Sequence, residues 1–155
     1  MLIPIISIIL IIILTAIFSA AEVALVVVSD SKVNEDVLNN NKKALKIQKF
    51  TTESKRYLLS IQVMITLLTL VNGAIALDAF YNDVMSLFND VSWLRPIARF
   101  IIIFIILFVQ LVFGRLIPRR LANKYTDTIA YQSIGFINFI HICLLPITWL
   151  LIDKL

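Results

Sequence analysis

The sequence predicts an all-α membrane protein with three transmembrane helices and a C-terminal juxtamembrane or re-entrant helical segment. Hydrophobic residues make up 60% of the 155 residues, charged residues only 15%, and the mean hydropathy is +0.94. Soluble domains are about 45–50% apolar and about 25% charged, so this composition excludes an ordinary water-soluble enzyme and a disordered chain. A membrane span needs about 20 apolar residues. The expected elements are spans at 2–28, 57–77 and 97–122, and a juxtamembrane segment at 128–152.

The first and last of these segments need separate justification. Residues 1–21 carry no charge and have no basic leader region, and their apolar run is longer than that of a signal peptide, so we expect a retained helix. Residues 128–152 are also uncharged but are the most polar of the four, and Pro146 interrupts them. A fourth span and an interfacial or re-entrant segment both remain open, and the polar content favours the second.

The distribution of basic residues predicts the orientation. Seven Lys/Arg lie in residues 30–56 and four in residues 115–127, whereas residues 78–99 hold only two. Short loops rich in Lys/Arg stay in the cytoplasm. We therefore expect a multi-pass protein of the cell membrane with its N-terminus outside and its C-terminus in the cytoplasm.

The cytoplasmic segment 30–56 is expected to form a short helical hairpin. Val33, Val37, Ala44 and Ile47 follow a helical spacing, and asparagines at 39–41 interrupt it with turn-forming residues. The second helix would lie along the membrane surface, although a solvated charged hairpin is an equal alternative. The basic residues expected to face anionic headgroups are Lys42, Lys43, Lys46, Lys49, Arg119 and Arg120.

Polar side chains within the spans predict a functional site, because ionisable groups in a membrane are costly. Glu22 and Arg115 both lie past the middle of inward-running helices, about 9–10 Å towards the cytoplasm at 1.5 Å per residue. Gln62 reaches a similar depth, and Ser19 and Thr66 lie within about one turn of these residues. We expect a polar site or small water-filled cavity. The alternative is that Arg115 extends to the headgroups.

The third span carries two further signals. Pro118 has no backbone donor and should free the carbonyl of Gly114, and a broken helix with free carbonyls is a common way to bind a cation in a membrane. A plain kink or helix end at Pro118 explains it equally well. Gly114 permits close helix packing, and Gln110 is expected to bond across a helix interface.

Several function classes lack support. The sequence contains no set of nucleophile, base and oxyanion donors, so we expect no enzyme. His141 and Cys143 have no third metal ligand near them, and His141 is interpreted as a satisfied structural or interfacial residue. A net charge of +4 is too small to indicate nucleic acid, and three glycines leave no phosphate-binding loop. The lipid bilayer is the expected partner.

Four segments resemble the CNNM/CorC family of magnesium transport or efflux proteins, and the resemblance extends over nearly the whole chain. Residues 18–25 (FSAAEVAL) resemble its FSASEIAL signature, and residues 41–44 (NKKA) its GNKKA stretch. Residues 59–67 (LSIQVMITL) are similar to ATIQVGITL, and residues 112–122 (VFGRLIPRRLA) to VFGEL(I)PKRLA.

The resemblance implies one CNNM-type transmembrane domain over 1–155, with three spans, an external N-terminus and a homodimeric assembly. Family members normally continue into a cytoplasmic CBS-domain pair, and often a further domain. No CBS or C-terminal soluble domain is expected within these 155 residues, which indicates an isolated membrane domain or a minimal protein, with a cytoplasmic or membrane partner subunit as a further possibility.

The resemblance also implies a magnesium site between the helices, with Ser19, Glu22 and Gly114 as the matching ligand positions. The chain departs from the family pattern elsewhere. The second serine of the first motif is Ala21, the Gly-Asn pair of the second span is Met64-Ile65, and the lysine of the third motif is Arg119.

The largest departure is Arg115, which replaces the motif glutamate. At about 4 Å and an effective dielectric near 20, each unit of repulsion is worth about 4 kcal/mol, and a dication feels roughly twice that. Our hypothesis is that Arg115 pairs with Glu22 and occupies the place of the cation. The expected function is therefore divalent-cation transport or efflux through a degenerate site. The alternative is a non-transporting partner, regulatory or immunity-like subunit on the same scaffold.

Overall fold

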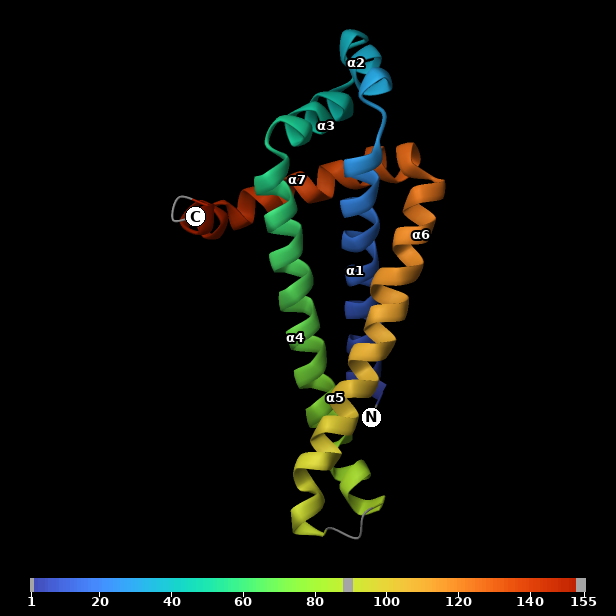
Figure 1. Ribbon diagram of the computed structural model, residues 1–155, viewed down its shortest axis with the longest axis vertical. Coiled ribbons are helices and arrows are strands. Elements are labelled where there is room, and N and C mark those ends of the chain that lie inside the picture. The colour runs from blue at the N-terminus through green and yellow to red at the C-terminus, as the bar shows by residue number, and fades with distance from the viewer. Residues whose placement is uncertain (1, 88–90, 153–155) are drawn as a thin grey trace.

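Three long helical segments run side by side along the axis of the molecule, and a fourth crosses one end (Figure 1). The computed structural model describes residues 2–87 and 91–152, and every regular element within them is helical. Along the axis lie α1, α4 and the continuous segment formed by α5, the π-helix η2 and α6. Their bounds are Leu2–Val27, Ser54–Leu87, Arg95–Leu111, Val112–Leu116 and Ile117–Lys124.

The remaining helices gather at one end, here called the hairpin end. The helices α2 (Asp30–Leu38) and α3 (Lys42–Thr52) connect α1 to α4, and α7 (Thr126–Ile152) runs across the axis beneath them (Figure 1). A three-residue 3₁₀ turn, η1 (Ser92–Leu94), precedes α5 at the opposite end. The chain thus runs towards the hairpin end in α1, away from it in α4, and back in α5–α6.

Four helical stretches are long and apolar enough to cross a membrane: Leu2–Val27, Ser54–Leu87, Arg95–Lys124 and Thr126–Pro146. This supports the predicted multi-pass, all-α membrane protein. Length and composition alone admit α7 as a fourth span, so they do not establish the expected count of three. The direction of α7 separates it from the others, because it lies across the three helices rather than beside them.

The second helix is longer than expected. The prediction of 57–77 followed the uncharged run, but α4 extends from Ser54 to Leu87 and continues past Asp78. A single carboxylate at the end of an apolar run does not terminate a helix, and α4 contains no proline. The third helix begins earlier than expected, with Pro96 in the first turn, where its missing N–H costs no hydrogen bond.

The segment between α1 and α4 forms two short helices, α2 and α3, joined by an asparagine turn. Asn40 adopts a left-handed conformation with φ 58°, which asparagine tolerates better than most residues. Asn41 then caps α3, its side-chain oxygen accepting a hydrogen bond from the N–H of Lys43 at 3.0 Å. Ala44 and Ile47 are buried, which fixes α3 against its neighbours.

The interior is divided into two apolar clusters. The larger one lies towards the hairpin end, where residues such as Phe18, Tyr57 and Ile134 pack between α1, α3, α4 and α7. The smaller one lies towards the opposite end and centres on Ile8, Ala76 and Ile102. Between the two clusters, the facing sides of α1, α4 and α5 carry polar side chains.

Candidate functional site

A layer of four polar side chains joins the three long helices, and we call Thr15, Thr69, Asn72 and Gln110 the polar layer. The Gln110 Nε2 group donates to the Thr15 hydroxyl at 3.2 Å and to the Thr69 hydroxyl at 3.3 Å. The Asn72 Nδ2 group donates to Gln110 Oε1 at 2.9 Å. Each hydroxyl also donates to a carbonyl of its own helix, Thr15 to Ile11 and Thr69 to Ile65, both at 2.8 Å. The expected bond of Gln110 across a helix interface is confirmed.

The register of α4 explains why Asn72 points inward. Tyr57, Ile61, Ile65, Asn72 and Ala76 are all buried and follow one another at intervals of four or seven residues, which places them on one face of a helix. Gly114 lies in the π-helix of the third long segment, and its lack of a Cβ allows α1 to approach closely. A Cβ at this position would lie 3.2 Å from Thr15 Cγ2 and 3.4 Å from Gln110 Cγ.

Two buried oxygens of this region have no hydrogen-bond partner among the described residues: Ser19 Oγ and Asn72 Oδ1. Both side chains are fully inaccessible to solvent. Ser19 lies one turn from Thr15 towards the hairpin end, and Asn72 about one turn from Thr69 the other way. At 1.5 Å per residue the backbone positions of Ser19 and Asn72 are therefore about 10 Å apart along the axis. A buried acceptor without a donor costs about 1–3 kcal/mol, so each of these groups is a candidate contact for a ligand or a water.

The third helix changes its winding beside the polar layer. Val112–Leu116 forms a π-helix, and the N–H of Ile117 donates back to the carbonyl of Val112. Pro118 follows and has no N–H to donate, so the regular hydrogen-bond ladder cannot continue through it. The helix nevertheless runs on as α6 to Lys124, so Pro118 does not end it. Single π-turns are frequent at functional sites.

The predicted pairing of Glu22 with Arg115 is wrong, because Glu22 pairs with Arg119. The Nη2 group of Arg119 donates to Glu22 Oε2 at 2.7 Å. Helix α6 packs along α1 and presents Arg119 to it, whereas Arg115 belongs to the π-helix and is turned elsewhere. The side chain of Glu22 is 13% exposed and that of Arg119 is 45% exposed, so the carboxylate is largely covered while the guanidinium reaches the surface.

Arg115 instead lines a cavity of about 250 Å³ together with Thr69, Leu107, Gln110 and Leu111. This cavity lies between α4 and α5, directly beside the polar layer. Arg115 is half-buried, and no described carboxylate lies within ion-pair distance of it.

The structure does not bring Gln62 and Thr66 together with Ser19 and Glu22. Both side chains are exposed, and the Thr66 hydroxyl donates to the carbonyl of Gln62 in its own helix at 2.8 Å. They lie on a different face of α4 from Ile61, Ile65 and Asn72. The prediction from depth along the helix did not include the direction in which these side chains point.

The predicted basic surface is exposed throughout, and α3 carries most of it. Its lysines share the outward side of the helix, while Ala44, Ile47 and Phe50 form the buried side. The exposed basic residues are Lys42, Lys43, Lys46, Lys49, Arg119 and Arg120.

A second buried polar group joins α4 to α7, and we call Tyr57, Ser60, Asn138 and His141 the α4–α7 junction. The rings of Tyr57 and His141 stack with centroids 3.8 Å apart. The Tyr57 hydroxyl donates to Asn138 Oδ1 at 2.8 Å, and Ser60 Oγ lies 2.9 Å from His141 Nδ1. The interpretation of His141 as a satisfied structural residue is confirmed.

The helix α2 is attached to α7 by two polar contacts. Lys32 Nζ donates to Asp127 Oδ2 at 2.7 Å, and the Tyr131 hydroxyl donates to Asp36 Oδ2 at 2.5 Å. The hydrogen bond that Lys32 donates to Asp127, together with the negative charge of Asp127, raises the pKa of Lys32 above its usual value. These contacts hold the hairpin over the start of α7.

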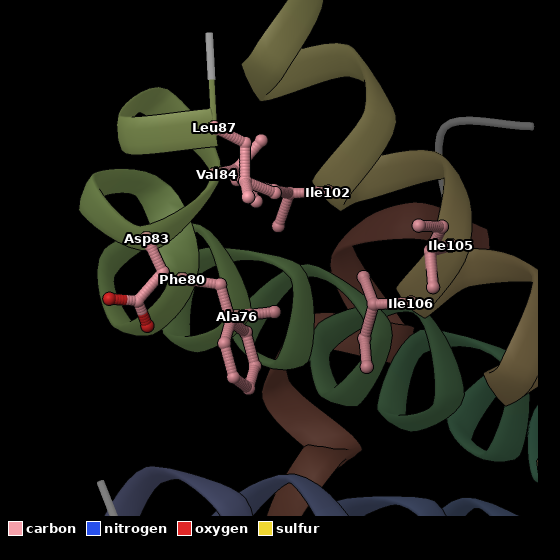
Figure 2. Close-up of a pocket in the computed structure, with 8 residues that line it drawn as sticks. All are labelled: Ala76, Phe80, Asp83, Val84, Leu87, Ile102, Ile105 and Ile106. Carbon is pink, nitrogen blue, oxygen red and sulfur yellow. The ribbon is translucent and has the colours of Figure 1, made fainter. Parts of the chain in front are cut away.

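Away from the polar layer, an apolar cavity of about 450 Å³ opens between α4 and α5 at the end opposite the hairpin (Figure 2). Phe80, Val84, Ile102 and Ile106 form its walls, and Asp83 is its one charged lining residue. Within the described part of the chain, no group of three His, Cys, Asp or Glu side chains gathers to hold a metal ion.

Sequence reasoning missed Thr15, Thr69 and Asn72 as members of the site. Each is one polar residue in a long apolar run. A helix that is apolar on all sides has no hydrophobic periodicity, so the sequence does not indicate which face points into the bundle. The available signal was that Asn72 follows the same helical spacing as Tyr57, Ile61 and Ile65.

Comparison with known proteins identifies the family. The sequence matches the CNNM family, described as the Cyclin M transmembrane N-terminal domain, over residues 5–154. It is 24% identical over 148 residues to the polyamine export protein of Haemophilus influenzae, covering 94% of this chain and 34% of that protein. It is 30% identical over 146 residues to the UPF0053 protein YrkA of Bacillus subtilis, covering 92% of this chain and 34% of that protein. The chain thus spans about a third of the length of these relatives, and across nearly all of its residues it belongs to the family of CNNM transmembrane domains.

Proposed function

We propose that this chain is the membrane domain of a cation transporter and that the cation passes between α1, α4 and α5–α6 through the polar layer. The observation that carries this proposal is the pair of buried, unpartnered oxygens of Ser19 and Asn72 on either side of Gln110. Oxygen acceptors inside a bundle suit a cation, because carbonyl and hydroxyl oxygens replace part of its hydration shell.

The proposed membrane arrangement has α1, α4 and α5–α6 as the three spans, with α7 lying along the membrane surface. The transverse direction of α7 supports this, and so does the interruption of its sequence by Pro146. The proposed orientation has the hairpin end in the cytoplasm and the N-terminus outside, and the basic residues of α3 support it. A homodimer is part of the proposal through the family resemblance.

The cargo is proposed as a multivalent cation, with magnesium or a polyamine as the candidates. Magnesium follows from the resemblance of the motifs and would use Ser19, Glu22 and Gly114. Glu22 is already neutralised by Arg119, however, and Arg115 lies beside the polar layer, so tight magnesium binding is disfavoured electrostatically. The polyamine candidate follows from one relative, the polyamine export protein of Haemophilus influenzae. Two acceptors on residues about 10 Å apart along the axis also suit an elongated cation with several ammonium groups better than one compact ion.

A second candidate function is a non-transporting partner or regulatory subunit on the same scaffold. The observation that favours it is the placement of the Arg115 guanidinium in the cavity beside Gln110, since a fixed positive charge there raises the barrier to any cation.

The test is flux through the full chain in proteoliposomes. Magnesium entry is followed with an enclosed fluorescent indicator, and polyamine entry with radiolabelled spermidine. We expect flux of at least one of the two, reduced at least about tenfold by Asn72→Leu, which removes an inward-facing acceptor. The matched control is Thr66→Val on the outward face of the same helix, which should transport like the wild type.

Each other outcome has a defined meaning. Equal loss in Asn72→Leu and Thr66→Val would place the path outside the polar layer. Absence of flux for both cations would reject the transport proposal and favour the partner subunit.

A further inference from the structure

Arg115 is a charged side chain without a described counter-charge in the apolar part of the molecule. It is half-buried against the cavity of about 250 Å³ between α4 and α5. Its nearest basic neighbour along the helix, Arg119, is already paired with Glu22. Charged groups inside a membrane are almost always paired, because leaving them unpaired is expensive. An anion from outside the described residues would balance the charge of Arg115.

The π-helix is the reason that Arg115 faces this cavity. In a regular α-helix, residues five apart such as Gln110 and Arg115 point about 140° away from one another. The wider π-turn at Val112–Leu116 reduces this angle, so that residues five apart point towards more nearly the same side. Both side chains line the same cavity as a result.

The walls of the cavity are of two kinds. Thr69 and Gln110 form a polar side that is continuous with the polar layer. Leu107 and Leu111 form an apolar side, and both are more than 40% exposed on the outer surface of the helix. The cavity therefore joins a guanidinium to an apolar surface that faces outward from the bundle.

We propose that this cavity binds a phosphate group, held by the guanidinium of Arg115, from either a phospholipid headgroup or free phosphate. A guanidinium can donate two parallel N–H groups to one phosphate, which fixes its geometry as well as balancing its charge. The exposed leucines lie where the first carbons of a lipid chain would continue from that headgroup. The proposal does not depend on cation transport.

The test measures phosphate binding to the purified full chain directly. Native mass spectrometry counts the phosphatidylglycerol retained after extensive detergent exchange, and a melting curve records the stabilisation on adding phosphatidylglycerol micelles or millimolar inorganic phosphate. The variants are Arg115→Gln, Arg115→Lys and, as the control, Arg120→Gln, which removes an exposed charge nearby that does not line the cavity.

We expect the wild type and Arg120→Gln to retain the same amount of lipid. Arg115→Gln should retain about tenfold less, and Arg115→Lys an intermediate amount. Stabilisation by phosphatidylglycerol but not by inorganic phosphate identifies the lipid as the source, and equal stabilisation by both identifies a free phosphate. Equal binding by Arg115→Gln and wild type would overturn the proposal, and so would equal loss in Arg120→Gln.

A second variant covers the case in which Arg115→Gln fails to fold. Leu107→Trp fills the cavity from its apolar side and leaves the charge of Arg115 in place. We expect this variant to lose the bound phosphate as well. Retention of the phosphate with the cavity filled would show that the binding is general surface attraction, and the proposal would be wrong.

Discussion

The polar layer and the α4–α7 junction are both buried groups of polar side chains, but they differ in how completely their hydrogen bonds are made. In the junction, Tyr57 bonds to Asn138 and Ser60 contacts His141, and none of these side chains carries a buried unpartnered atom among the described residues. In and beside the polar layer, Ser19 Oγ and Asn72 Oδ1 are left without partners. Both regions lie on the same helix, α4, about three turns apart.

The difference separates a structural role from a functional one. A fully satisfied buried network stabilises one arrangement of its helices. A network that leaves acceptors without partners gives a lower free energy of unfolding than a fully bonded one. Binding sites commonly have this property. The comparison therefore predicts that substitutions in the junction lower stability, whereas substitution of Ser19, which makes no side-chain hydrogen bond, changes transport at little cost in stability.

The largest effect is expected at His141. His141→Ala removes a ring that stacks on Tyr57 and contacts Ser60, and it leaves a cavity between α4 and α7. We expect the free energy of unfolding in mixed micelles to fall by roughly 2–4 kcal/mol. Flux measured at a temperature where the variant is folded should keep its selectivity. A stable His141→Ala variant with altered selectivity would move the functional site to the junction.

The sharpest comparison uses two buried serines. Ser60→Ala leaves His141 Nδ1 without its contact and should lower the free energy of unfolding by about 1–2 kcal/mol. Ser19→Ala removes an oxygen that has no partner, so its stability should be unchanged or slightly higher, while cation flux falls. Equilibrium unfolding and flux are measured on both variants. Equal destabilisation by the two substitutions would mean that Ser19 is paired in the folded protein.

Charge patterning was sufficient to predict the elements but not their faces. The hairpin of α2 and α3 followed from Val33, Val37 and the asparagine turn, and the long helices followed from uncharged runs. The ends of α4 were misplaced because the prediction used charge as a boundary, whereas a single charged residue does not end a helix. Asp78 therefore lies within α4 instead of at its end.

The composition of the site was only partly predictable, because depth in the membrane says nothing about direction around a helix. The sequence predicts the same depth for Glu22 and Arg115, but the two side chains lie against different neighbours. No periodic pattern in the sequence predicts the π-helix that turns Arg115 towards Gln110. Arg119, one turn further on, reaches Glu22 because α6 packs along α1. Which charged side chains pair across helices can be predicted only when the packing of the helices is known.

Gly114→Ala tests how tightly α1 and the π-helix approach at the polar layer. The new Cβ would lie 3.2 Å from Thr15 Cγ2 and 3.4 Å from Gln110 Cγ, so Thr15 must shift by a few tenths of an ångström. We expect a loss of about 1 kcal/mol in stability, with a larger fractional loss of flux because the bond from Gln110 to Thr15 is stretched. Gly135→Ala is the matched control, since nothing lies within 4 Å of its Cβ. Flux and unfolding curves that are the same for both variants would contradict the close approach.

The smallest effect is expected from the ion pair of Glu22 and Arg119. Glu22→Gln, Arg119→Gln and the double variant form a cycle, and we expect a coupling free energy of about 0.5 kcal/mol, because Arg119 is 45% exposed and water screens it. Arg115→Gln combined with Glu22→Gln is the matched second cycle and should give a coupling close to zero, since those side chains do not pair. Unfolding in mixed micelles measures both cycles, and a larger coupling between Glu22 and Arg115 would restore the pairing that the sequence first predicted. A coupling confined to Glu22 and Arg119 would leave Arg115 free to bind an anion, which is the arrangement that distinguishes this chain from a protein with a glutamate at the same position.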